Sequence, residues 1–150
     1  MGVVNGGPPG ESAEDRCQRY RDHLLIPAVV VSGSERIVVR PLPAWLGVVV
    51  MPERLSAQVI ERLASSWHRG PVIAHPRSNR MSFLTGPLTG YEHGIERKLL
   101  SLNTGVGASC VVLPSPMDER TGFRRWVSQP CCGYLPPMPA VLRTLVEVAR

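Results

Sequence analysis

Residues 70–84 contain two short apolar runs separated by a polar, basic turn. Val72, Ile73 and Phe83 in these runs favour strands, and the Pro-Arg-Ser-Asn segment between them is typical of a turn. The pattern predicts a β-hairpin with strands at 71–75 and 80–85. Its tip would expose Arg77, Asn79 and Arg80, with His75 close by, so we expect a ligand to bind there.

The length and composition predict one α/β domain. The chain has 150 residues, of which 43% are hydrophobic, and this is enough to build a single sizeable core. Residues 1–11 are rich in glycine and proline and are expected to form a flexible tail, which leaves residues 12–150 as the domain.

The first half of the domain shows clear local signals. Ser12 is a good N-cap for a helix over 13–24, with Cys17, Tyr20 and Leu24 facing inward and Arg16 and Arg19 facing water. Valine-rich runs predict a strand hairpin at 27–32 and 36–40 and a buried strand at 46–50. A helix over 53–68 follows, and its apolar stripe predicts a buried face made of Leu55, Val59, Leu63 and Trp67.

The second half continues the alternation of helices and strands. We expect a helix over 90–102, a strand over 108–113, a loop over 114–122, an extended segment over 123–128 and a C-terminal helix over 140–149. The strands 46–50, 71–75, 80–85 and 108–113, with two helices between them, follow the order β-α-β-β-α-β. The predicted fold class is therefore α+β, with a ferredoxin-like or RRM-like sheet and helices on one face, preceded by a helix and hairpin and followed by a C-terminal helix.

The basic charge points to an anionic partner. The formal net charge is +5, and Lys98 is the only lysine, so arginine carries nearly all of the positive charge. The planar guanidinium fork matches phosphate or carboxylate. One basic group flanks the predicted hairpin and a second surrounds Phe123. If the two groups meet in space they form a groove that follows phosphates, with Phe123, Trp126 or Tyr134 available to stack on bases; the alternative is that the arginines occupy separate solvated turns.

No motif in the sequence supports a specific catalytic activity. A nucleophile elbow, a P-loop and a CxxC pair are all missing, and the predicted strands contain no pair of carboxylates for a metal ion. Cys17, Cys110, Cys131 and Cys132 are expected to be reduced, mostly structural thiols, and the adjacent pair lacks the spacing of a metal clamp. We therefore expect no metal and no cofactor.

The sequence also lacks targeting signals. The N-terminus has no basic and apolar leader pattern, and no apolar run approaches the roughly 20 residues needed to cross a bilayer. These features predict a cytoplasmic protein without a membrane partner, and they leave its oligomeric state open.

A set of short motifs resembles a known family. They are Gly70-Pro71-Val72, His75, Arg80, Phe83-Leu84, Val112-Leu113-Pro114-Ser115, Arg124-Arg125-Trp126-Val127, Pro130 and 136–142. Over about residues 44–150 the chain resembles a degenerate form of the bifunctional primase/polymerase N-terminal domain, of the archaeo-eukaryotic primase class, as found in a group of actinobacterial proteins. Active members carry an acidic pair at the end of a central strand and a histidine in a Ser-Gly-Gly-x-His hairpin. Here 46–52 contains no carboxylate, and Met81 stands near the histidine position.

The resemblance implies a primase-like domain that has lost catalysis and binds single-stranded nucleic acid or a nucleotide. The residues expected to bind are Arg69, His75, Arg77, Asn79, Arg80, Arg120, Arg124, Arg125 and Trp126. An alternative is a protein-interaction or regulatory module that docks a protein partner through the proline-rich segment 129–139 and the C-terminal helix. A third interpretation is an enzyme centred on His75 with Cys110 or Cys131.

Overall fold

The computed structural model describes residues 9–39, 45–88, 94–107 and 110–150. Within them the chain forms an α+β fold with two antiparallel sheets and five helices. The first eight residues of the tail predicted over 1–11, and the predicted element ends at 40, 90–93 and 108–109, lie outside the described residues.

The larger sheet has five strands in the order β6-β3-β5-β4-β8. In chain order they are β3 (Gly47–Pro52), β4 (Val72–His75), β5 (Arg80–Thr85), β6 (Gly105–Gly107) and β8 (Arg125–Ser128). Strands β4 and β5 form the predicted hairpin, in which His75 is paired with Arg80. The hairpin is therefore confirmed, and it lies inside the sheet rather than at its edge.

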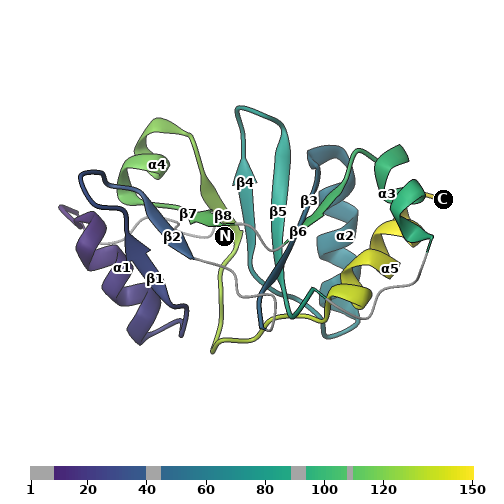
Figure 1. Ribbon diagram of the computed structural model, residues 1–150, viewed down its shortest axis with the longest axis horizontal. Helices are drawn as coiled ribbons and strands as arrows, with labels where there is room; N and C mark the ends of the chain where they lie inside the picture. Colours follow the sequence, from purple (N-terminus) through teal and green to yellow (C-terminus); the bar gives the residue numbers. More distant parts are fainter. Residues whose placement is uncertain (1–8, 40–44, 89–93, 108–109) are drawn as a thin grey trace.

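Side chains alternate between the two faces of the larger sheet, as the twofold repeat of a strand requires. Val49 and Met51 of β3 pack on one face, whereas Val48 packs on the other. The first face is covered by α2 (Glu53–Ser65), α3 (Ile95–Ser101) and α5 (Met138–Val148), which lie together at one end of the molecule in Figure 1. The apolar faces of the amphipathic helices α2 and α5 thus form part of one of the two core clusters.

The second face of the larger sheet packs against the N-terminal part of the chain. Helix α1 (Ala13–Asp22) and the smaller sheet, in the order β1-β2-β7, form this layer opposite the α2 and α5 helices (Figure 1). Its strands are β1 (Ala28–Val30), β2 (Ile37–Val39) and β7 (Val111–Leu113). Ile73, Leu84 and Trp126 of the larger sheet are buried in the same apolar cluster as Tyr20 and Ile37.

The fourth strand of the predicted β-α-β-β-α-β unit was assigned wrongly. Residues 111–113 do not join the larger sheet but pair with β2, with Ile37 opposite Leu113 and Val39 opposite Val111. All four of these side chains are buried. The larger sheet instead takes Gly105–Gly107 next to β3 and adds β8 beyond β4. A short apolar run carries no information about which of two sheets it will join.

Trp67 was expected to be buried and is 91% exposed. Helix α2 ends at Ser65, and the backbone N–H groups of Trp67 and His68 bond back to the carbonyls of Ala64 and Leu63. This pair of bonds is a Schellman motif, with Trp67 in the left-handed conformation at φ 63°. The chain leaves the helix at that turn, so the apolar stripe continues only through Leu55, Val59 and Leu63.

Two other expectations also need correction. Arg16 was placed on the solvent side of α1 but is 1% exposed, and Glu11 of the predicted tail is bonded to it. The predicted loop 114–122 contains a short helix, α4 (Pro116–Thr121), which Ser115 caps through a reciprocal bond with Asp118. Ser12 is the N-cap of α1, as predicted, and it forms the same reciprocal bonds with Asp15.

Candidate nucleic-acid interface

The tip of the β4–β5 hairpin contacts the segment between α4 and β8. The guanidinium carbon of Arg77 lies 3.7 Å from the centre of the Phe123 ring, a stacked cation–π arrangement. Arg77 also donates a hydrogen bond of 3.3 Å from Nη2 to the carbonyl of Thr121. The hairpin tip and the segment that carries the second basic group therefore meet at this point.

His75 lies at the base of the same tip and is half buried. Its Nε2 is 2.8 Å from the hydroxyl oxygen of Ser82 on the neighbouring strand. Burial lowers the pKa of His75, and the positive charges of Arg124 and Arg80 lower it further against the opposing effect of Asp118. The field at this imidazole is therefore positive, which is the condition that attracts an anion.

Arg124 is held beside His75 by a carboxylate. Its Nη1 lies 3.3 Å from Oδ2 of Asp118, and the Arg124 side chain is only 22% exposed. Its Nε atom is buried and has no hydrogen-bond partner among the described residues. A buried donor without an acceptor is costly, so the fold carries one unmet hydrogen-bonding group at this arginine.

Arg80 and Asn79 are partly occupied by the fold itself. Arg80 donates from Nη2 to the carbonyls of Val50 at 3.1 Å and Asn103 at 2.7 Å, which ties the hairpin to β3 and to the segment before β6. Asn79 is exposed in a left-handed turn conformation, and its carbonyl accepts the first N–H of α2 from Glu53. These two residues stabilise the conformation of the tip, and Arg77 is the more exposed of its two arginines.

Other predicted binding residues lie elsewhere. Arg69 precedes β4, at the opposite end of the strand from the tip, and donates from Nε to the hydroxyl of Ser128 at 3.2 Å. Arg120 on α4 and Arg125 on β8 are both exposed. The fold thus brings together five residues, Arg77, Phe123, His75, Arg80 and Arg124. It leaves Arg69 outside this group.

Trp126 does not offer a stacking surface. It is 2% exposed, and its indole N–H donates to the hydroxyl of Tyr20 at 2.9 Å. The ring of Tyr20 meets it edge to face, with the ring centres 5.9 Å apart. A base cannot reach this ring, so we remove Trp126 from the candidate interface; Phe123, which is 44% exposed, takes that place.

A hollow of about 250 Å³ lies next to Arg124 and Phe123. Ser34, Glu35 and Arg36 from the β1–β2 turn line it on one side, and Ser115, Met117 and Asp118 line it on the other. It contains two arginines and two carboxylates, so its charges nearly balance. The positive field is concentrated where Arg124 faces His75 and Arg80.

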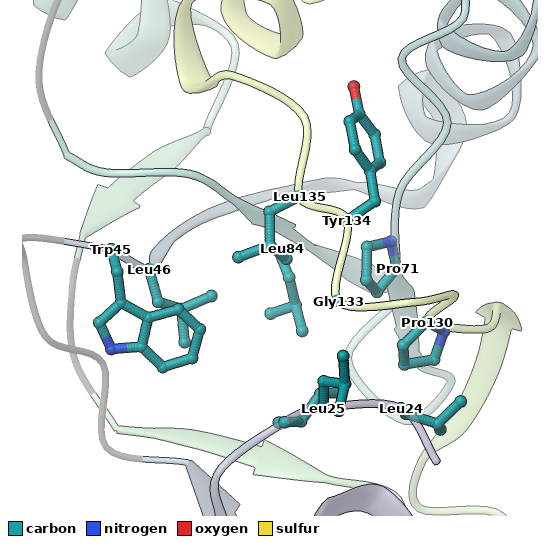
Figure 2. A pocket seen from close by; sticks show the side chains of 11 residues that line it. Leu24, Leu25, Trp45, Leu46, Pro71, Leu84, Pro130, Gly133, Tyr134 and Leu135 are labelled. Atoms are coloured by element: carbon teal, nitrogen blue, oxygen red, sulfur yellow. The ribbon is translucent and has the colours of Figure 1, made fainter.

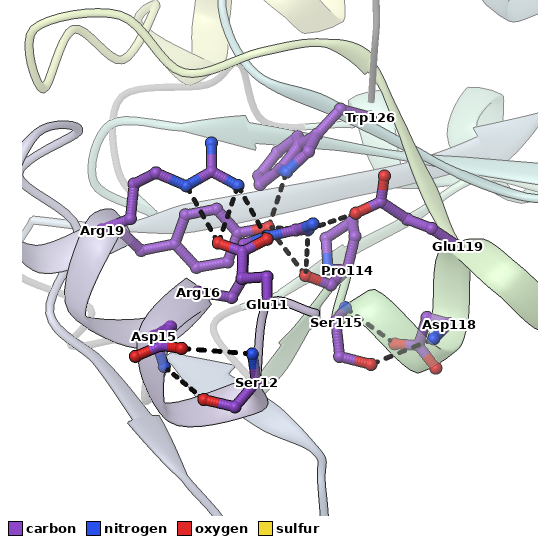
Figure 3. Close-up of polar contacts among 11 residues, drawn as sticks. Glu11, Ser12, Asp15, Arg16, Arg19, Pro114, Ser115, Asp118, Glu119 and Trp126 are labelled. Carbon is purple, nitrogen blue, oxygen red and sulfur yellow. Dashed lines mark hydrogen bonds and ion pairs between the residues drawn. The ribbon is translucent and has the colours of Figure 1, made fainter. Parts of the chain in front are cut away.

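A second polar cluster, buried between α1 and α4, is shown in Figure 3. Arg16 donates to Glu11 at 2.8 Å and also pairs with Glu119 of α4. Tyr20 donates its hydroxyl proton to the carbonyl of Pro114 at 2.7 Å and accepts the Trp126 indole bond. Burial works to lower the pKa of Arg16, but its bonds to Tyr20, Glu119 and Glu11 outweigh that effect and raise it. These groups are enclosed and, apart from Oε2 of Glu119, already paired, so the cluster is structural.

An apolar pocket lies between the segment after α1 and residues 130–135. Figure 2 shows Leu24, Leu25, Trp45 and Leu84 around it, with the Tyr134 side chain directed away from the cavity. Its volume is about 20 Å³. A cavity of that size holds about one water molecule, so it is too small for a substrate or cofactor.

The described residues contain no group of three or more His, Cys, Asp or Glu side chains placed to share a metal ion. The part of the chain that the structure describes also has no helix of the length and apolar character required to cross a membrane.

Sequence reasoning missed Ser82 as the partner of His75. A signal was present, because residues two apart on a strand share a face, which places Ser82 beside Arg80 on the side of His75. Asp118 could not be assigned in the same way, since its segment was expected to be a loop.

No protein-family model matches this sequence, and neither a curated protein nor a solved structure matches it. The geometry of the site is therefore the basis for the functional conclusion.

Proposed function

We propose that this protein is a non-catalytic, primase-like domain that binds single-stranded nucleic acid at the hairpin tip. The observation that carries the proposal is the stack of Arg77 on Phe123, which joins the two basic segments into one surface. A surface that combines guanidinium groups with an exposed aromatic ring suits a flexible strand of phosphates and bases.

The phosphate would bind where Arg124, Arg80 and His75 converge. The Arg124 side chain is 22% exposed, and the two arginines already lower the pKa of His75. A phosphate oxygen in this position offsets the mutual repulsion of the three groups. It also raises the pKa of His75, so binding strengthens as the pH falls.

The base would stack at the outer edge of the same surface. Arg77 and Phe123 are both exposed, and either a guanidinium plane or an aromatic ring can support a base. Because stacking accepts every base, we expect binding with little sequence preference. A free nucleotide uses the same two contacts and is expected to bind more weakly, since it offers fewer phosphates.

We also propose a ferredoxin-like unit as the framework of the site. The segment from β3 to β6 runs strand, helix, strand, strand, helix, strand, and its strands are ordered β6-β3-β5-β4, which supports this topology. The resemblance to the primase class adds support from the sequence alone. Strand β3 contains no carboxylate, which favours binding without phosphoryl transfer. A cytoplasmic location accords with such a role and stays a prediction.

The test is fluorescence anisotropy with a labelled short oligothymidine between about 50 and 200 mM salt. We expect tight binding at low salt and a steep loss as salt rises. Arg124→Ala should weaken binding and reduce the salt slope by about one, because one phosphate contact is lost. Arg143→Ala is the matched control, since it removes the same charge from the exposed face of α5, on the other side of the sheet.

Two results would overturn the proposal. One is the absence of oligonucleotide binding by the wild-type protein even at low salt. The other is an equal loss of binding in Arg124→Ala and Arg143→Ala, which would show that only net charge matters. Chemical unfolding of both variants verifies that Arg124→Ala retains the fold after its bond to Asp118 is lost.

The alternative of a docking module receives less support. The apolar face of α5, which includes Val141, Leu142 and Leu145, is buried against the larger sheet and α2. In the proline-rich segment Pro136 is also buried, and its carbonyl accepts a bond from the Gly86 N–H. The longest exposed stretch of this segment is the turn at 131–134, which contains two adjacent cysteines.

A further inference from the structure

The exposed turn at Cys131–Tyr134 has an unusual backbone for its sequence. The N–H of Tyr134 donates to the carbonyl of Cys131 at 3.0 Å, and both central residues have positive φ, 56° at Cys132 and 74° at Gly133. Turns of this kind normally place Asn, Asp or Gly at the first central position. Cysteine in a left-handed conformation is disfavoured there, and such local violations concentrate at functional sites.

The turn directs the two cysteine side chains toward each other. The Sγ atoms of Cys131 and Cys132 are 3.2 Å apart, and both residues are exposed. Two thiolate bonds of about 2.3 Å, opened at roughly a right angle on one atom, separate their sulfurs by about 3.3 Å. The pair is therefore already spaced for a pyramidal centre, whereas the wider angle at a tetrahedral ion requires the sulfurs to move apart.

The surroundings hold this arrangement in place. Pro130 and Pro136 on either side of the turn are buried, and Gly133 lies beside the Leu25 side chain, at a distance where an added Cβ would make an ordinary van der Waals contact. Tyr134 is positioned by its hydroxyl, which lies 3.2 Å from Nδ1 of His68. An anchored turn lowers the conformational cost of bidentate binding.

We propose that Cys131 and Cys132 form a vicinal dithiol site for a trivalent arsenic compound. The two sulfurs occupy two positions of the pyramidal arsenic, and the third carries an organic substituent. Within the described residues no third His, Cys, Asp or Glu completes a metal site, which accords with a centre that needs only two protein ligands.

The reaction is a condensation without electron transfer. With phenylarsine oxide, each thiol loses its proton and forms one As–S bond, and the oxide oxygen leaves with both protons as water. The oxidation state of arsenic is unchanged, so no oxidant or reductant is required. The pKa of the Cys131 thiol is raised by its neighbour Cys132, which disfavours two adjacent thiolates and favours a ligand that neutralises both.

The substituent on arsenic has an apolar surface to contact. The two cysteines line an open hollow of about 740 Å³ together with Trp67, Pro130 and Tyr134. Trp67 is 91% exposed, so its ring is free to cover an aryl group. We therefore expect a phenyl arsenical to bind more tightly than a methyl arsenical.

The test combines intact-mass spectrometry with a thiol competition. Wild-type protein should take up one phenylarsenic group per chain with loss of two free thiols, retain it against a monothiol, and release it to a dithiol. Cys131→Ser and Cys132→Ser should each bind at least about 100-fold more weakly, because the second bond is no longer intramolecular. Cys110→Ser is the matched control, since Cys110 is an exposed cysteine outside the turn.

Three results would overturn this site. They are loss of the arsenical from wild-type protein in monothiol, undiminished retention by Cys131→Ser or Cys132→Ser, and a loss in Cys110→Ser as large as theirs. Trp67→Ala tests the hollow separately and should bring phenyl and methyl arsenicals to similar affinity. An unchanged phenyl preference in that variant would overturn the contact with Trp67.

Discussion

Two clusters in this molecule use similar side chains in opposite ways. The cluster between α1 and α4 joins Arg16 to two carboxylates and two aromatic residues, and its arginine is 1% exposed. The cluster at the hairpin tip also combines arginines, a carboxylate and an aromatic ring, but Arg77 is exposed and the Arg124 side chain is 22% exposed. The first is enclosed and paired, and the second is open with positive charge in excess.

The two clusters differ in whether the protein itself supplies partners for their charged groups. Around Arg16, protein groups supply almost all the partners, although Oε2 of Glu119 has none among the described residues. At the tip, His75 is pushed toward its neutral form by burial and by two arginines. Enclosed ion pairs are costly to break, while an open cationic surface is available to a ligand.

The largest expected effect is on the enclosed cluster. Arg16→Ala leaves Glu119 buried without its cation and Glu11 paired with Arg19 alone, so we expect the free energy of unfolding to fall by about 3–5 kcal/mol. Arg19→Ala removes a neighbouring pair whose arginine is 37% exposed and should cost less than about 1 kcal/mol. Urea unfolding monitored by circular dichroism measures both changes. An equal fall in the free energy of unfolding in the two variants would contradict the view that the enclosed ion pair is the costly one to break.

The second prediction concerns the open cluster. Phe123→Ala removes an exposed ring, so we expect the free energy of unfolding to fall by no more than about 1 kcal/mol. Binding of oligothymidine should weaken by about 1–3 kcal/mol, the usual value of one stacked base. Anisotropy titration beside a urea curve separates the two quantities. A large stability loss with unchanged binding would make Phe123 a structural residue.

The smallest effect is the pH dependence of stability. The folded pKa of His75 lies below its ordinary value, so between the two values the unfolded chain binds more protons than the folded one. The free energy of unfolding should therefore decrease as the pH falls below about 6.5 and level off below the folded pKa. His75→Gln should have a shallower decline, measured by urea unfolding across this range. An identical decline in the variant would show that other groups cause it.

Much of the local structure could be predicted from the sequence. The β4–β5 hairpin, the capped start of α1 and the buried stripe of α2 through Leu63 follow from turn residues, an N-cap and a helical repeat. The prediction was wrong where the helix ended before its apolar repeat did. Trp67 continues the apolar spacing of α2, but the Schellman motif ends the helix before that position.

The candidate site was predicted in part. Arg77, His75 and Arg124 were identified from charge and from their place near turns, and these side chains do gather. Trp126 was chosen for its aromatic ring, yet it became a core residue because Tyr20 offered its indole an acceptor. Composition shows that an aromatic or basic residue is present, but it does not show which face of a strand will be buried.

The amino-acid sequence by itself determined the elements whose causes lie within a few residues, since capping bonds, turns and amphipathic repeats act over that distance. The tertiary structure decided which elements meet. Arg77 and Thr121 are 44 residues apart in the chain, and Arg16 and Glu119 are 103 apart. Such contacts depend on how two sheets share one core, so the same residue types became an enclosed support in one place and an open cationic surface in the other.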